Sequence, residues 1–187
     1  DTHVTTENIG YVSWIVGKLH ADGGTVMKPA LALALTDQPG LSRVRQIIFL
    51  TDGNVDNEQE LFGLIKQHLG DNRLFTVGIG SAPNSYFMRK AARAGRGSFT
   101  HIGNIDEVQQ KTNALLGKLE YPALVNIDMS IEGLEVEAFP HPISDLYLGE
   151  PITVLIRGRQ LGNTITLYGD FGESSWQQKI ELVDGMD

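Results

Sequence analysis

The sequence has no cysteine, no long apolar run and fewer basic than acidic residues, and each of these absences excludes a class of protein. Without cysteine, the chain forms neither disulfides nor thiolate metal sites. No stretch approaches the about 18 consecutive apolar residues that a membrane-spanning helix needs. There are 15 Lys and Arg against 23 Asp and Glu, and the resulting net charge of −8 argues against a nucleic-acid partner.

Signatures of catalysis are also scarce. The five histidines show no paired spacing of the kind that zinc sites use, and no nucleophile motif of the Gly-x-Ser-x-Gly type occurs. The acidic residues are spread evenly, so no carboxylate pair stands out for acid–base chemistry. We therefore expect a protein that is not an enzyme.

The chain is organised around residues 47–50, which are followed by Thr51, Asp52 and Gly53. Four large apolar residues in a row predict a strand that is buried on both faces of a parallel sheet. Asp52 then lies where the carboxyl end of this strand opens into a loop. In doubly wound α/β sheets, ligands bind at that end of the strands, so Asp52 is a candidate binding residue.

Helical and strand patterns alternate around this strand. Two further parallel strands are expected, and the alternation predicts crossover connections through helices. The fold class is therefore α/β, a partial doubly wound (Rossmann-like) parallel sheet with flanking helices. The expected helices cover about residues 5–19, 26–36, 57–69, 84–95 and 104–119, and the further strands cover 73–79 and 98–102. Thr5 or Thr6 is expected to cap the first helix, Asn84 to start the fourth, and Asn104 with Glu107 to open the last. The residues expected to face inward are Ile9, Val12, Val16 and Leu19 on the first helix and Val108, Leu115, Leu116 and Leu119 on the last.

The pattern changes at Tyr121, after which apolar residues alternate with polar ones. Glycine and proline separate the strands, as is typical of a small antiparallel β module. We expect two domains, residues 1–120 and residues 121–187. The predicted strands of the β module cover residues 124–131, 151–158, 163–169 and 175–183.

Two motifs in the α/β part are similar to those of a known domain family. Gly23-Gly24-Thr25 precedes an amphipathic helix, and Leu50-Thr51-Asp52-Gly53 ends the next buried strand. This order resembles the von Willebrand factor type A domain, and most closely that of inter-alpha-trypsin-inhibitor heavy-chain-like proteins. The resemblance implies a metal-ion-dependent adhesion site to which Thr25 and Asp52 contribute oxygen ligands. The first loop of that site, Asp-x-Ser-x-Ser, is absent, so the chain is expected to be a domain truncated at its amino terminus.

The resemblance also implies a function. Such domains bind protein ligands without catalysis, and the bound protein supplies a carboxylate to the ion. The ion would be Mg²⁺, or Mn²⁺ or Ca²⁺, in the intact domain, and would bind weakly or not at all to this fragment because two protein ligands make a poor site. The parent protein is expected to be secreted or to lie at the cell surface or in the cell envelope.

Two alternative functions follow from other features. Gly78-Ile79-Gly80 follows a strand, as in the dinucleotide fingerprint of a nucleotide-binding Rossmann-like enzyme domain. However, Pro83 occupies the third glycine position, and no acidic residue ends the next strand, so a tight strand-to-helix turn is the preferred interpretation. A structural module that no longer uses its metal site is the third possibility.

Truncation before the Asp-x-Ser-x-Ser strand would have a consequence for assembly. In the family that strand pairs with the strand at residues 45–51, so its loss would expose an apolar edge. Exposed edges of this kind pair with other chains. The expectation is a homodimer formed through this edge.

Overall fold

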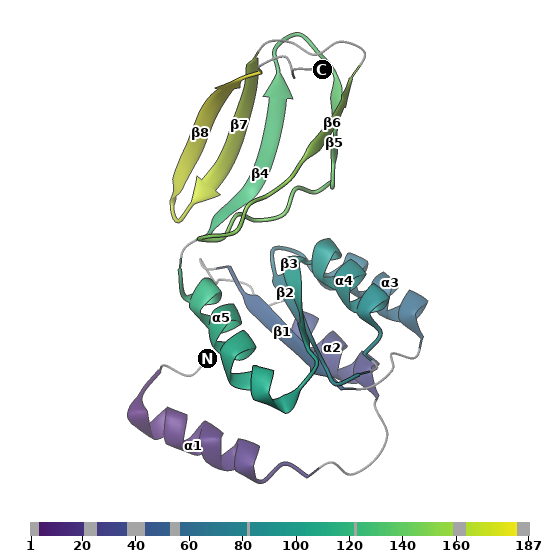
Figure 1. Ribbon diagram of the computed structural model, residues 1–187, viewed down its shortest axis with the longest axis vertical. Helices are drawn as coiled ribbons and strands as arrows, with labels where there is room; N and C mark the ends of the chain where they lie inside the picture. The colour runs from purple at the N-terminus through teal and green to yellow at the C-terminus, as the bar shows by residue number, and fades with distance from the viewer. Residues whose placement is uncertain are drawn as a thin grey trace.

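The structure is a computed structural model that describes residues 4–20, 26–36, 44–52, 57–81, 83–121, 123–158 and 164–182. It has two parts, an α/β region up to Tyr121 and the β module that follows (Figure 1). The β module lies above one end of the parallel sheet, and α5 leads into it (Figure 1).

The sheet of the α/β region has three parallel strands in the order β1-β2-β3. They are β1 (Gln46–Thr51), β2 (Arg73–Ile79) and β3 (Arg96–Ile102). Apolar and β-branched residues dominate β1 and β2, as expected for strands that are covered by helices. The predicted fold class, a Rossmann-like parallel sheet with flanking helices and antiparallel strands after it, is confirmed.

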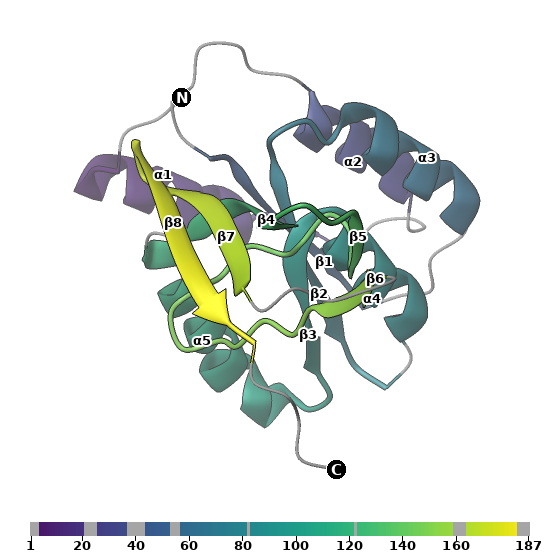
Figure 2. The same ribbon diagram turned by 90° about the horizontal axis from the view of Figure 1, so that it is seen from above.

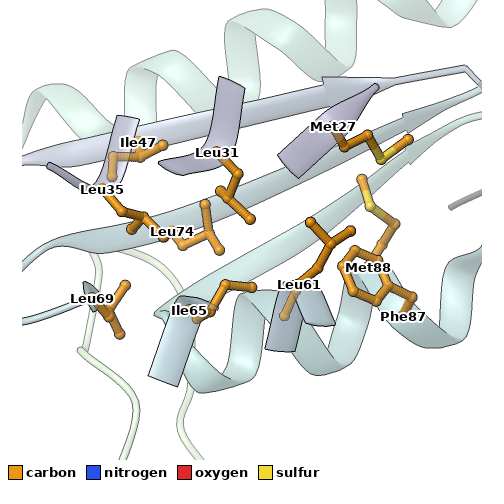
Figure 3. Packing of buried hydrophobic residues seen from close by; sticks show 11 residues of the cluster. Met27, Leu31, Leu35, Ile47, Leu61, Ile65, Leu69, Leu74, Phe87 and Met88 are labelled. Atoms are coloured by element: carbon orange, nitrogen blue, oxygen red, sulfur yellow. The ribbon is translucent and has the colours of Figure 1, made fainter. Parts of the chain in front are cut away.

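Three helices cover one face of this sheet: α2 (Met27–Leu35), α3 (Glu58–His68) and α4 (Ser85–Ala94). Their apolar residues recur every three or four positions and so form one buried stripe on each helix. These stripes pack against side chains of β1 and β2 (Figure 3). The buried residues of this cluster are Met27, Leu31, Leu35, Ile47, Leu61, Ile65, Leu69, Leu74, Phe87, Met88 and Ala91.

A single helix, α5 (Val108–Glu120), covers the opposite face and follows a 3₁₀ turn, η1 (Ile105–Glu107). The predicted capping box is present, because the Asn104 side chain accepts from the backbone N–H of Glu107 and the Glu107 carboxylate accepts from the backbone N–H of Asn104. Of the apolar residues expected to face inward, Leu115 is buried, whereas Leu116 is exposed. The second core cluster consists of Phe75, Val77, Ile102, Leu115 and Tyr147.

The strand predicted to be buried on both faces is β1, and this prediction is wrong. Leu50 is 58% exposed, and β1 is the outer strand of the sheet in the described part of the chain. The doubly buried strand is β2, in which Phe75 and Thr76 on successive faces are both fully buried. A run of apolar residues indicates that a strand can pack against other segments on both faces. It does not show that those segments are part of this chain.

The first helix, α1 (Thr6–Gly17), is capped as predicted by the hydroxyl of Thr5, which accepts from the Asn8 N–H at 3.2 Å. Its apolar residues nevertheless remain exposed, and no residue of α1 is buried. Figure 2 shows α1 at the periphery of the molecule. The side chains expected to form its inner face, Ile9, Val12, Val16 and Leu19, are each more than half exposed.

The β module contains two small antiparallel sheets, one of three strands in the order β4-β7-β8 and one formed by β5 and β6. The sequence predicted four of these strands and missed the short β5. Only a few apolar residues of the module are buried, among them Ile131, Ile143 and Ile165. The strands are β4 (Leu124–Ile131), β5 (Val136–Phe139), β6 (Leu155–Gly158), β7 (Thr164–Phe171) and β8 (Ser174–Glu181).

Candidate functional site

The candidate binding residue Asp52 follows the last residue of β1 and is exposed. Its position is fixed by the strand, because Thr51 is buried and pairs in register with Gly78 of β2. The next strand continues this alignment, since Gly78 pairs with His101 of β3. The carboxyl ends of all three strands therefore meet at one edge of the sheet, and Asp52 carries a negative charge at that edge.

The loop ends beside Asp52 are held by hydrogen bonds between strands and helices. The Gly80 N–H donates to the Ile102 carbonyl at 2.8 Å, and the Gly80 carbonyl oxygen lies 2.9 Å from Nε2 of His101. Nζ of Lys111 donates to the His101 carbonyl at 2.6 Å. This edge is thus a built surface in which the turn after β2 is tied to β3 and α5.

A second carboxylate at this edge, Glu107, serves the fold. Its Oε2 accepts from Lys111 at 2.9 Å and from the Gly103 N–H at 2.9 Å. The hydrogen bond from Lys111, together with those from the backbone N–H groups of Gly103 and Asn104, lowers the pKa of Glu107 below its usual range. Glu107 is occupied as a helix cap and is therefore not a free ligand.

The metal site implied by the resemblance has only part of its ligand set in the described structure. Asp52 lies where it was expected, immediately after β1, and it is exposed. Thr25 and its two preceding glycines lie outside the described residues. Within the described ranges, no group of three or more acidic or histidine side chains could hold a metal ion. A single carboxylate does not satisfy the about six oxygens that Mg²⁺ takes, so the assignment of Thr25 and Asp52 stays a prediction.

The glycines that resembled a dinucleotide fingerprint have a packing role. A Cβ at Gly78 would lie 2.8 Å from the Cβ of Pro83 and 3.2 Å from the ring of Phe99. Gly80 has a φ of +92°, which only glycine adopts readily. Asn84 then caps α4 by accepting from the Phe87 N–H at 3.0 Å. The tight strand-to-helix turn accounts for both glycines without a nucleotide.

Sequence reasoning missed a second polar cluster, which joins the two parts of the chain. We call it the junction cluster, and it consists of Arg73, Arg96, Asn126 and Asp145. Arg73 forms a buried ion pair through Nε with Oδ2 of Asp145. Arg73 and Arg96 each donate to Oδ1 of Asn126 at 3.3 Å. Arg73 and Arg96 belong to the sheet of the α/β region, whereas Asn126 and Asp145 belong to the β module, so the cluster bridges the two.

Burial sets the electrostatics of the junction cluster. It raises the pKa of the Asp145 carboxyl, an effect that the guanidinium groups of Arg73 and Arg96 oppose. It also lowers the pKa of Arg96, to which repulsion by Arg73 adds. The one sequence signal for this cluster was Arg73 itself, a charged residue that opens an otherwise apolar strand.

Aromatic packing surrounds the junction cluster. The ring of Tyr147 meets the ring of Phe75 edge-on, with centroids 5.6 Å apart. Nζ of Lys118 lies 4.8 Å from the centroid of Tyr147 and donates to the Ser98 hydroxyl at 2.9 Å. Burial, reinforced by the nearby Asp145 charge, raises the pKa of Tyr147 to about 12. These contacts place Tyr147, a residue of the β module, inside the second core cluster.

Comparisons with known proteins agree with this geometry. A von Willebrand factor A domain-containing protein of Dictyostelium discoideum is 26% identical over 186 residues, covering 97% of this chain and 22% of that protein. The von Willebrand factor A domain-containing protein 5B1 of Mus musculus is 26% identical over 148 residues, covering 77% of this chain and 12% of that protein. The chain therefore spans less than a quarter of the length of either relative.

A solved structure and a family profile extend the comparison. A von Willebrand factor type A protein from Catenulispora acidiphila superimposes with a TM-score of 0.69 at 19% identity, covering 95% of this chain and 50% of that one. This likeness establishes the fold. The profile of the von Willebrand factor type A domain matches residues 7–101, which include β1, β2, most of β3 and Asp52. With half of its length matched, the chain belongs to the von Willebrand factor type A domain family.

Proposed function

We propose that the chain is a non-catalytic protein-binding module whose recognition point is the carboxyl edge of the parallel sheet. The observation that carries the proposal is Asp52, an exposed carboxylate held at the end of β1 in a type A fold. The edge around it is fixed by the contacts of Gly80, His101 and Lys111. A rigid edge that presents an exposed carboxylate suits binding.

The finer features of this proposal follow from the resemblance. Asp52 and Thr25 serve as ligands of Mg²⁺, Mn²⁺ or Ca²⁺ in the intact domain, and a carboxylate of the bound protein completes the shell. Adhesion by a secreted, cell-surface or cell-envelope protein of the heavy-chain-like type is the corresponding role. Within the described ranges no helix could span a bilayer. We further propose a domain boundary at residues 120–121, where the parallel sheet gives way to antiparallel strands.

Calorimetry with Mn²⁺ tests whether the ion, Asp52 and a partner's carboxylate act together. We expect Mn²⁺ alone to bind this chain with a millimolar or weaker dissociation constant, because few protein ligands are present. A capped Gly-Asp-Gly tripeptide should strengthen Mn²⁺ binding, since its carboxylate supplies a further ligand. The Asp52→Ala variant should abolish the effect, whereas Asp106→Ala, an exposed acid on η1, should preserve it.

Two outcomes would contradict the proposal. If the tripeptide had no effect on Mn²⁺ binding, or an equal effect in Asp52→Ala, the partner's carboxylate would not meet the ion at Asp52. If Mn²⁺ alone bound with a micromolar constant that Asp52→Ala removed, the chain would complete the site by itself. In that case the shared-ligand mechanism would be wrong, although the location of the site would hold.

We also propose that the chain forms a homodimer through the free edge of β1. In the described part of the chain, β1 pairs on one side only, with β2. Leu50 of β1 is exposed, and α1 carries further exposed apolar side chains. Pairing with a second copy would satisfy the backbone groups of the edge.

Light scattering after size exclusion tests the dimer. Leu50→Lys should convert a dimer to a monomer, because the side chain is exposed and the substitution places a charge at the interface. Leu33→Lys is the matched control, since Leu33 is exposed on α2, which lies on the opposite side of the sheet. A monodisperse wild-type monomer would contradict the proposal.

A further inference from the structure

The strands β4 and β5 begin as a hairpin and then separate. A two-residue turn at Glu132 and Gly133 joins them, and the Leu134 N–H donates to the Ile131 carbonyl at 3.2 Å. Continuing this register would pair Met129 with Val136. Instead, β5 pairs along its whole length with β6. The expected ladder between β4 and β5 is therefore replaced by a gap.

On its side of the gap, β4 has a free edge. Its ladder with β7 occupies one side, and in the described part of the chain its other side pairs only at the two ends, at Leu124 with Leu146 and at Ile131 with Leu134. Figures 1 and 2 both show β4 lying between β7 and the pair β5 and β6. Two sheet edges thus flank one space, which Met129 and Ser130 of β4 line on one side.

A groove of about 730 Å³ occupies this space. Its walls come from all three strands and combine apolar side chains with acidic ones. The volume lies within the range of sites that hold a ligand, about 300–1,000 Å³. The residues that line it are Met129, Ser130, Leu134, Glu135, Val136, Glu137, Arg157 and Gly158.

At the free edge of β4, one backbone N–H is hydrogen-bonded to a neighbouring side chain. The Met129 N–H donates to Oδ1 of Asp128 at 2.8 Å rather than to a neighbouring strand. Such local side-chain bonds compete with strand pairing and can be exchanged for it. This donor is therefore satisfied in the free protein and could be transferred to an added strand.

The charged residues around the groove indicate which kind of segment it can bind. Arg157 is ion-paired with Glu137, with Nε 2.8 Å from Oε2, whereas Glu135 has no ion pair among the described residues. Asp128 and Glu132 add two more carboxylates near the edge. The carboxylates near the edge would attract a basic segment.

From these observations we propose that the groove binds an extended segment of a partner protein in which apolar and basic residues alternate. The segment adds as a strand between β4 and β5 and joins the two small sheets into one. Main-chain hydrogen bonds to both edges hold it, as in other cases of strand addition. Its apolar side chains contact Met129, Leu134 and Val136, and its basic side chains face Glu135 and Asp128.

Fluorescence anisotropy with a labelled, capped (Val-Lys)₄ peptide tests this. The peptide should bind the wild-type chain, and a (Val-Glu)₄ peptide should bind at least about tenfold more weakly, a difference of about 1.4 kcal/mol. A (Val-Lys)₄ peptide that is N-methylated at alternate residues should lose binding, because it keeps the charge but cannot donate to both edges. Hydrogen exchange of the Met129 and Val136 amides should slow when (Val-Lys)₄ binds.

Charge-reversal variants test whether the peptide binds at the groove. Glu135→Lys should weaken (Val-Lys)₄ binding about three- to tenfold, in line with the loss and reversal of one exposed charge pair. Glu173→Lys, in the turn between β7 and β8, is the matched control and should leave binding unchanged. Thermal unfolding would verify that both variants are folded. Equal binding of the N-methylated peptide, equal effects of the two variants, or a dimer that Glu135→Lys dissociates would overturn the proposal.

Discussion

The α/β region and the β module are held together in different ways. The α/β region has two clusters of buried apolar residues, one on each face of its sheet. In the described part of the β module, β4 to β8 contribute no residue to either cluster, and large side chains such as Leu155 and Phe171 are exposed. The module also makes buried contacts with the α/β region, through Asp145 and Tyr147.

This difference shows how a small β module can be stable with a thin core. A unit of about 65 residues without disulfides usually has too little apolar burial to fold alone. Here the buried ion pair between Arg73 and Asp145 and the ring contact between Phe75 and Tyr147 anchor the module to the larger core. We therefore predict that the stability of the β module depends on its neighbour.

Breaking the ion pair of the junction cluster should have the largest effect. Asp145→Ala leaves the Arg73 guanidinium buried without its partner, which should lower the free energy of unfolding by about 3–5 kcal/mol. The double variant Arg73→Met with Asp145→Leu removes both charges and should restore most of the loss. Urea denaturation followed by circular dichroism measures both. A double variant as unstable as Asp145→Ala would show that the charges themselves are needed.

Truncating one leucine in each part should sharpen the contrast. Leu61 is buried in the first core cluster, and Leu61→Ala should lower the free energy of unfolding by about 2–5 kcal/mol. Leu155 is exposed on β6, and Leu155→Ala should change it by no more than about 0.5 kcal/mol. Equal losses in the two variants would mean that the β module buries Leu155 against something in solution.

Alkaline pH should weaken the junction through Tyr147. Its pKa is about 12 in the folded chain against 10.0 for a free phenol, so the unfolded chain loses this proton first. The contribution of Tyr147 is complete below pH 10 and is lost between pH 10 and 12, and it amounts to about 3 kcal/mol. Because other groups titrate there too, the measured quantity is the difference between wild type and Tyr147→Phe. A difference that stayed constant from pH 9 to 12 would contradict this.

Local signals in the sequence predicted most of the fold. Helical spacing, the caps at Thr5, Asn84 and Asn104, and the apolar run of β2 all indicate elements that the structure contains. The double burial of β1 could not be predicted correctly, because it depends on which segments pack beside the strand. The short β5 was missed because four residues give too little alternation to stand out.

The candidate site was predictable only where one strand end determines it. Asp52 lies at the carboxyl edge because β1 ends immediately before it. The junction cluster joins residues as far apart as Arg73 and Asp145, a separation of 72 positions, and no local pattern reports such a contact. Arg73 in an apolar strand indicated that a buried partner exists, but it could not identify that partner.

The dependence of the β module on the α/β region is tested most directly by expressing residues 122–187 alone. We expect no cooperative thermal transition, rapid amide exchange throughout β4 and β7, and recovery of protected amides only in the intact chain. The reason is that the separated module loses the contacts of Asp145 and Tyr147 with the α/β region. A cooperative transition in the isolated module, with β4 and β7 amides as protected as in the intact chain, would contradict this dependence.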